Sequence, residues 1–224
     1  MVEPLSREEF LDEKRDFSPL LVHLTKDDDA NMMYAKDALD MILDQKTLKA
    51  FNHFCLFDSD LEKLRDVSLR EKFKVVCFTE TPIDQINVLL TEVSGRNFKP
   101  KPYGLVFKKE YIRQQKGNPV FYVSGNLFDS LWQLYNDAKE RSFSLNDNRV
   151  LALVNRCDEI VDFHWEREWR IIGDLKFRLD DIYCGLCPKE EIPNFESKYG
   201  LKFIDPRWGI NRILDKLVNL SKER

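Results

Sequence analysis

The sequence predicts an α+β fold in which a central mixed or antiparallel sheet is flanked by helices. Short β-type runs recur along the chain, helical patterns are clustered early and interspersed later, and strands and helices do not alternate regularly. Neither a low-complexity linker nor an internal repeat interrupts the 224 residues. We therefore expect a single domain over residues 1–224, with an N-terminal extension at 1–18, a core at 20–206 and a C-terminal helix at 207–224.

The charge and hydropathy of the chain argue against several classes of protein. The formal net charge is −4, so we expect no overall attraction to nucleic acid or to an anionic membrane. No apolar run approaches the roughly 20 residues of a membrane span. The N-terminal "MVEPLSREEFLDEKRDF" also lacks the apolar stretch of a signal peptide. The sequence therefore predicts a cytoplasmic protein with neither membrane insertion nor direct nucleic-acid binding.

In the first half of the chain, β-type and helical patterns follow one another in an irregular order. "LLVHLT" is a short β-type run, and Asp27 to Asp29 behind it offer an N-cap and an acidic first turn for a helix. Apolar residues then recur at helical spacing as far as Leu43. Further along we expect a polar helix at 59–73, a buried strand at 74–82 and a short helix at 83–90.

The second half contains most of the predicted strands. Gly117 and Asn118 form a turn signal between two strand patterns. The C-terminal "INRILDKLVNLSKER" is amphipathic and carries basic residues in its last turn, as a helix prefers. The expected elements are strands at 103–112 and 118–125, helices at 127–140 and 148–160, strands at 165–172, 181–188 and 201–206, and a helix at 210–224.

Five cysteines fit a reducing compartment as free thiols. Cys184 and Cys187, in "YCGLCP", have the CxxC spacing of zinc and redox motifs. A structural zinc site needs a second ligand pair, which the sequence does not offer, and a redox motif would sit near the start of a βαβ unit. We therefore expect both thiols to be small core residues without metal, with a metal or redox role as the alternative.

The stretch "HWEREWRII" at 164–172 has the densest concentration of ionisable groups and ends in two isoleucines. Read as a strand, it alternates its side chains between two faces. One face would then carry a row of ionisable side chains, and the other would pack. The ionisable face comprises His164, Glu166, Glu168 and Arg170, and the packed face Trp165, Arg167, Trp169 and Ile171.

Several stretches resemble one bacterial family when they are taken in order. "HLT", "CFTETP", "YGLVFKKE", "NPVFYV", "EREWR" and "YCGLCP" are similar to segments of the abortive-phage-infection AbiGi-type proteins and their wider relatives of unknown function. The resemblance covers roughly residues 20–190, and "CFTETP" and "EREWR" are its most specific elements. It implies a role in phage defence, in a toxin–antitoxin setting, with a toxin or another protein as partner.

A more distant resemblance carries chemistry. The order His-x-Thr, an aromatic-Thr-Glu strand, tyrosines on strands and a late Glu-x-Glu is similar to ADP-ribosyltransferase-like domains. Those domains fold as a split antiparallel α+β sandwich and bind NAD between two sheets. This chain departs from their pattern, because His23 stands where the Glu-x-Glu members have Arg, and "CFTET" stands where they have Ser-Thr-Ser.

The transferase resemblance implies roles for particular residues. Glu168 would stabilise the oxocarbenium-like transition state as a fixed anion, and Glu166 would deprotonate the acceptor. His23 and Thr25 would hydrogen-bond NAD, an aromatic side chain would stack on the nicotinamide, and the arginines would hold the diphosphate. The cofactor-binding set is His23, Thr25, Phe78, Thr79, Tyr103, Tyr122, Arg167 and Arg170.

Each of these residues also has a structural interpretation. His23 lies between two apolar residues and fits a core histidine, while Thr79 and Glu80 fit a turn before Pro82. Tyr103 and Tyr122 fit a core, and the arginines of "EREWR" can neutralise its glutamates in an ion network.

Three classes of function therefore compete. The first is an NAD-dependent ADP-ribosyltransferase or NAD glycohydrolase, and the second is a non-catalytic antitoxin-like or sensor binding module. The third is a metal-dependent nuclease, which is disfavoured because Glu166 and Glu168 are flanked by arginines rather than by further acidic residues.

Overall fold

The computed structural model describes residues 17–51, 55, 57, 63, 67–91, 99–140, 145–157 and 164–218. The chain forms two compact units, each built from segments that are distant in the sequence. Unit 1 comprises residues 1–46, 79–111 and 177–224, and unit 2 comprises residues 47–78 and 112–176.

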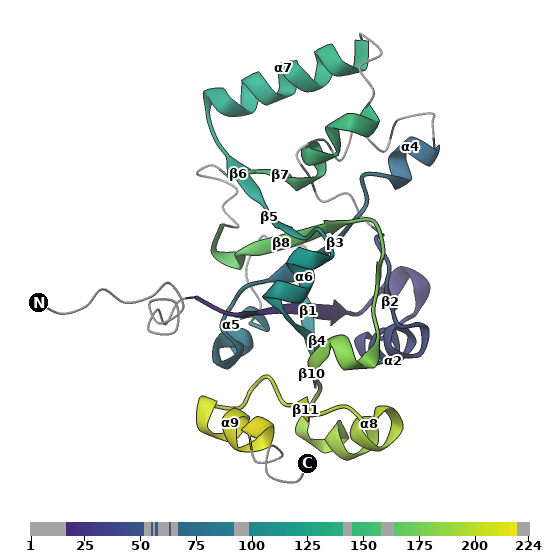
Figure 1. The fold of residues 1–224 in the computed structure, drawn as a ribbon, viewed down its shortest axis with the longest axis vertical. Helices are drawn as coiled ribbons and strands as arrows, with labels where there is room; N and C mark the ends of the chain where they lie inside the picture. The colour runs from purple at the N-terminus through teal and green to yellow at the C-terminus, as the bar shows by residue number, and fades with distance from the viewer. Residues whose placement is uncertain are drawn as a thin grey trace, which may run out of the picture. The chain divides into compact units, whose positions relative to one another are not determined.

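The largest sheet has seven strands in the hydrogen-bonded order β11-β10-β4-β1-β3-β8-β5 (Figure 1). It is a mixed sheet, because β10 and β11 are parallel while β1 and β4 are antiparallel. The predicted α+β class, with a mixed sheet and flanking helices, is therefore confirmed. The strands are β1 (Leu20–Lys26), β3 (Val75–Thr79), β4 (Pro100–Lys108), β5 (Asn118–Pro119), β8 (Glu168–Ile172), β10 (Ile182–Leu186) and β11 (Phe203–Ile204).

Unit 1 is organised around the long antiparallel pair of β1 and β4. Their register runs from Leu20 opposite Lys108 to Lys26 opposite Pro100, with an irregularity between Leu24 and Lys26. Gly104 is required in this pair, because an added Cβ would lie 2.2 Å from the carbonyl oxygen of His23. One apolar core cluster of the unit comprises Val22, Leu24, Ile86, Leu89, Val106, Cys184, Leu186, Ile204 and Ile213.

The helices of unit 1 are short. The α-helices are α2 (Ala35–Gln45), α5 (Ile86–Leu89), α8 (Ile192–Tyr199) and α9 (Ile210–Val218). The 3-10 helices are η1 (Asp29–Asn31), η2 (Ile83–Gln85), η5 (Leu179–Asp181) and η6 (Lys189–Glu191). The predicted C-terminal helix is thus present as far as Val218, and residues 219–224 lie outside the described residues.

The first long helix begins later than predicted. Asp28 caps the 3-10 helix η1 by accepting a hydrogen bond from the Asn31 backbone N–H, so the acidic run does not begin α2. Asp27 instead accepts a hydrogen bond from the backbone N–H of Ala35, the first residue of α2, at 2.9 Å. The two aspartates therefore accept backbone hydrogen bonds at the starts of η1 and α2 in turn. The prediction from the aspartates alone placed the start of the long helix too early.

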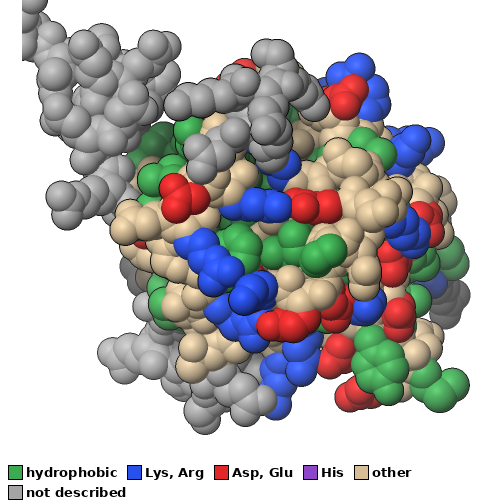
Figure 2. All heavy atoms as spheres, turned by 90° about the horizontal axis from the view of Figure 1, so that it is seen from below, with side chains coloured by type: hydrophobic (Ala, Val, Ile, Leu, Met, Phe, Trp, Pro, Cys, Tyr) green, Lys and Arg blue, Asp and Glu red, His purple; other side chains and the backbone are tan. Residues whose placement is uncertain are grey.

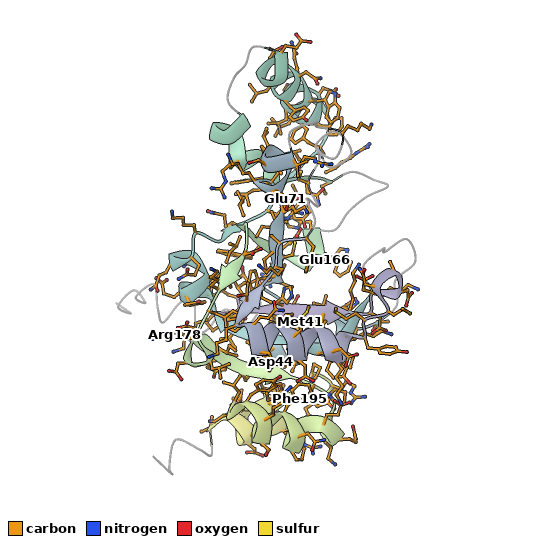
Figure 3. The ribbon with its side chains drawn as sticks, turned by 90° about the vertical axis from the view of Figure 1, so that its right-hand side faces the viewer. Met41, Asp44, Glu71, Glu166, Arg178 and Phe195 are labelled. Atoms are coloured by element: carbon orange, nitrogen blue, oxygen red, sulfur yellow. The ribbon has the colours of Figure 1, made fainter. Side chains whose placement is uncertain are left out.

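Polar contacts connect helix α8 to α2. The Tyr199 hydroxyl donates to Asp40 at 2.6 Å and lies 3.0 Å from an oxygen of Asp44. Asp44 on α2 and Phe195 on α8 are labelled in Figure 3. Acidic and basic side chains lie beside one another on the face shown in Figure 2. Lys198 on α8 and Asp40 on α2 form an ion pair, with 2.9 Å between Nζ and Oδ1.

Unit 2 combines small sheets with a helical layer. Strand β2 (Thr47–Leu48) pairs with β9 (Leu175–Lys176), and β6 (Phe121–Val123) pairs in parallel with β7 (Val154–Arg156). The helical elements are α4 (Val67–Glu71), α6 (Lys109–Gln114, which begins in unit 1), α7 (Asn126–Glu140), η3 (Leu145–Leu153) and η4 (His164–Glu166). One core cluster comprises Cys55, Phe57, Phe73, Val75, Tyr135, Leu151 and Ala152, with the Phe57 and Tyr135 rings stacked 4.5 Å apart.

Three predicted elements have different bounds or types. A helix was expected over 148–160, but η3 continues to Leu153 and Val154 to Arg156 form β7, because they pair with β6. Residues 158–160 lie outside the described residues. The strand predicted over 103–112 ends at Lys108, where α6 begins. Of the helix predicted over 59–73, the structure shows α4, and most of its first half lies outside the described residues.

None of the helices in the described part of the chain has the length and hydropathy of a membrane-spanning segment.

Candidate functional site

The stretch "HWEREWRII" is not one continuous strand, so that part of the prediction was wrong. His164 to Glu166 form the 3-10 helix η4, and β8 begins only at Glu168 (Figure 3 labels Glu166). Arg167 connects the two elements. Its backbone φ of 49° lies in the left-handed region, which residues other than glycine rarely adopt. The predicted row therefore breaks after Glu166, and the strand-like spacing expected between Glu166 and Glu168 does not apply.

Within β8, Glu168 and Arg170 share one face and form a two-point ion pair. Arg170 Nε donates to Glu168 Oε1 at 2.9 Å, and Nη2 donates to Oε2 at 2.8 Å. The third nitrogen, Nη1, donates to the backbone carbonyl of Ala152 at 2.8 Å. Each nitrogen of the guanidinium thus has a partner in unit 2.

The two members of this pair differ in burial. The Arg170 side chain is 1% exposed, whereas that of Glu168 is 12% exposed. Burial by itself lowers the pKa of Arg170, but the adjacent Glu168 carboxylate outweighs burial and raises that pKa above its ordinary value. Arg170 is therefore permanently charged, and Glu168 offsets the free-energy cost of burying that charge.

Tyr122, on β6, adds a further donor to the carboxylate. Its hydroxyl donates to Glu168 Oε2 at 3.3 Å, and its ring meets the ring of His164 edge-on at 5.7 Å between centroids. Burial and then the Glu168 charge raise the pKa of Tyr122, so its hydroxyl remains protonated. Tyr122 therefore contacts both η4, through His164, and the ion pair, through Glu168.

Cys77, on β3, also lies at the ion pair. Burial raises the pKa of its thiol well above the ordinary value, and the Glu168 charge raises it further. The thiol form is a poor nucleophile, because the thiolate is the reactive species. Cys77 therefore contributes volume and a weak hydrogen-bonding group to the site rather than nucleophilic chemistry.

The other predicted residues of unit 2 lie in different surroundings. Phe78, on β3, is buried among the apolar side chains, with 2% of its surface exposed. Arg167 and Glu166 are half-buried, and Trp165 between His164 and Glu166 is exposed. The predicted residues that unit 2 brings together are Tyr122, Glu168 and Arg170.

The remaining predicted residues belong to unit 1, and three of them have hydrogen-bond partners nearby. Thr25 is buried, with its hydroxyl 2.9 Å from the carbonyl oxygen of Ala35 and 3.2 Å from that of Tyr103. The Tyr103 hydroxyl donates to Glu191 at 2.8 Å. The Thr79 hydroxyl accepts from the Thr81 backbone N–H, which matches the turn interpretation of this stretch.

His23 is half-buried on β1, where it lies opposite Leu105 of β4. Its neighbours along the strand, Val22 and Leu24, are core residues. This position fits both interpretations of His23, as a core histidine and as a residue that contacts a ligand.

Unit 1 also contains a buried ion pair that the sequence did not indicate. Lys109 is 3% exposed, its Nζ lies 2.7 Å from Glu80 Oε1, and it also lies 3.6 Å from the centre of the Phe17 ring. "FKKEY" looks like a solvated charge run, and only the turn into α6 places the second lysine inside. No sequence signal separates it from Lys108, which is exposed.

The CxxC cysteines are core residues, as predicted. Cys184 and Cys187 are free and buried, and Gly185 between them accommodates the ring of Phe203, which an added Cβ would approach to 2.1 Å. Within the described ranges, no three His, Cys, Asp or Glu side chains are grouped so that they could hold a metal ion.

In comparisons with known proteins, no protein-family model, no curated protein and no solved structure matches this chain. The observations that bear on its function are therefore the fold and the geometry of the site.

Proposed function

We propose that this chain binds NAD and cleaves the bond between nicotinamide and ribose, transferring ADP-ribose to water or to an acceptor. The observation that supports this proposal is the orientation of Glu168, which is the more exposed end of an otherwise buried ion pair. A carboxylate fixed in this way can stabilise developing positive charge without reorganising during the reaction. Such a preorganised anion is what cleavage of NAD requires.

The reaction assigns a defined role to the anion. The bond from the anomeric carbon to the nicotinamide nitrogen breaks, and the nicotinamide leaves with the electron pair. Positive charge develops at the anomeric carbon, where Glu168 would stabilise it. Water or the acceptor then forms the new bond and releases a proton, and Glu166 is the proposed base for that proton when an acceptor is used.

The resemblances in the sequence support the biological setting of the proposal. The AbiGi-type segments favour a phage-defence role with a protein partner or acceptor, and the transferase-like order of motifs favours NAD as the cofactor. Thr25 and Tyr103 already hydrogen-bond within their unit, which favours structural roles for them.

Release of nicotinamide from NAD tests the proposal. We expect the purified protein to release nicotinamide, measured by chromatography with and without cell lysate. Glu168→Gln keeps the size of the side chain but removes the anion, so we expect release to fall by roughly 100-fold or more per folded molecule. The folded fraction must be measured in parallel, because this change also removes the counter-charge of buried Arg170.

One observation favours a second candidate, a non-catalytic binding module. Both oxygens of Glu168 already accept hydrogen bonds from Arg170, and Oε2 also accepts one from Tyr122. A carboxylate with about four acceptor positions then has few left for a ligand. NAD binding by calorimetry without nicotinamide release would support this module, and absence of both binding and release would contradict the NAD proposal.

A further inference from the structure

The Arg170 guanidinium is held at three points inside unit 2. Two of its nitrogens donate to the two oxygens of Glu168, and the third donates to the carbonyl of Ala152. Ala152 is itself fully buried in η3. A planar group with three fixed donors cannot rotate, so the plane of the carboxylate that it binds is fixed as well.

Charge compensation and orientation are separate properties of this pair. A lysine at position 170 would still supply a positive charge, but its ammonium is a compact point charge that does not match both carboxylate oxygens. Arg170 is 1% exposed and has no surface at which to meet a ligand. Arg170 can therefore affect a bound molecule only indirectly, and Glu168 is the charged group that it holds.

We propose that Arg170 is the positioning residue of this site and sets the orientation in which Glu168 faces its ligand. The inference rests on the proposed function for its effect on turnover. It extends that function by making the rate depend on the shape of a buried side chain as well as on the Glu168 charge.

Unit 1 offers a matched control for an arginine-to-lysine change. Arg207 donates from Nε and Nη2 to the two oxygens of Asp205, at 2.8 and 2.6 Å. The carboxylate stands two residues before the arginine there too, but neither residue belongs to the Glu168 site. Arg207→Lys therefore breaks the same kind of two-point contact without touching Glu168.

The experiment compares the full-length wild type with Arg170→Lys and Arg207→Lys. For nicotinamide release we expect kcat of Arg170→Lys to fall by roughly 10- to 100-fold, the scale of a misplaced group, with KM nearly unchanged. Arg207→Lys should keep the wild-type kcat. An equal kcat for the two variants, after correction for the folded fraction, would overturn the positioning role.

A second readout measures the carboxylate itself and needs no turnover. Carbodiimide-driven amidation, quantified by peptide mass spectrometry, should be slow at Glu168 in the wild type and several-fold faster in Arg170→Lys. Glu166 serves as the internal reference. If the wild type releases no nicotinamide, the proposed function fails, while the amidation rates still decide whether Arg170 holds Glu168.

A third variant keeps the proposal testable if Arg170→Lys does not fold. Tyr122→Phe removes the 3.3 Å hydrogen bond to Oε2 and leaves both contacts with Arg170 in place. We expect Glu168 to be amidated at the wild-type rate in this variant. A several-fold faster reaction would mean that Tyr122 holds the carboxylate, and the assignment of Arg170 would be wrong.

Discussion

Two arginine–carboxylate pairs in this protein share one local design and differ in which partner is buried. In both, the carboxylate precedes the arginine by two residues and accepts hydrogen bonds from Nε and Nη2. In unit 2 the cation is inside, with Arg170 1% and Glu168 12% exposed. In unit 1 the anion is inside, with Asp205 4% and Arg207 53% exposed.

The buried partner determines what the pair can do. Asp205 also accepts hydrogen bonds from the backbone N–H groups of Lys189 and Arg207, each at 2.9 Å. It therefore holds the backbone at both of these positions. Arg170 donates its remaining hydrogen bond to the Ala152 carbonyl, and the Glu168 carboxylate that it binds is the more exposed partner. The buried anion, Asp205, thus accepts hydrogen bonds from the backbone around it. The buried cation, Arg170, is paired instead with a carboxylate that is partly exposed.

Removal of the buried cation should have the largest effect on stability. Arg170→Met keeps much of the side-chain volume but leaves Glu168 without its partner, and we expect a loss of about 3–5 kcal/mol in the free energy of unfolding. Urea unfolding monitored by circular dichroism measures this loss. Adding Glu168→Gln to the Met variant should recover part of it. A strictly additive double variant would show that the pair carries no coupling energy.

Removal of the buried anion should cost less, because its partner can remain in water. Asp205→Ala leaves two backbone N–H groups without an acceptor, and we expect a loss of about 2–4 kcal/mol. Asp205→Asn retains an acceptor oxygen and should be affected less in the same urea experiment. Equal losses for Ala and Asn would indicate that the charge, rather than hydrogen bonding, fastens this segment.

The Asp205–Arg207 pair of unit 1 should lose its stabilising effect in acid. Burial tends to raise the pKa of Asp205, but hydrogen bonds from Arg207 and from two backbone N–H groups outweigh burial and lower it. Because the folded pKa lies below that of the unfolded chain, the stabilisation is complete above the unfolded value. It is lost as pH falls through the folded pKa, below about 4. Urea midpoints of wild type and Asp205→Asn between neutral and acidic pH should therefore converge, whereas parallel curves would contradict this origin.

The smallest change in stability is expected at the exposed end of the unit 1 pair. Arg207→Lys retains the charge in a side chain that is more than half exposed, so the unfolding free energy should change by at most about 1 kcal/mol. Differential scanning calorimetry can compare it with Arg170→Lys, which we expect to melt at a clearly lower temperature. Similar melting temperatures would remove the distinction between the two pairs.

Sequence patterns predicted the elements whose signals are local. The strand at 74–82, the helix at 127–140 and the strand of "YCGLCP" all appear near their expected positions. The shared face of Glu168 and Arg170 also follows from strand periodicity and is confirmed by their contacts.

The errors arose where distant contacts decide the local structure. The break at Arg167 accompanies the packing of His164 on Tyr122, a residue more than 40 positions earlier, and no local pattern marks it. Val154 to Arg156 became a strand because β6 was available as a partner. Lys109 is buried because Glu80 and Phe17 surround its ammonium, which its own neighbours in the sequence do not indicate.

Because Cys184 and Cys187 are buried, their reaction with a thiol reagent can measure how often this part of unit 1 opens to solvent. Cys184 is 1% and Cys187 0% exposed, and burial raises the pKa of the Cys187 thiol to about 12. An aromatic disulfide reagent can therefore react with either thiol only after the buried segment 184–187 becomes exposed to solvent. The labelling rates of these two cysteines, followed by mass spectrometry, would record how often unit 1 opens under native conditions, without any engineered probe.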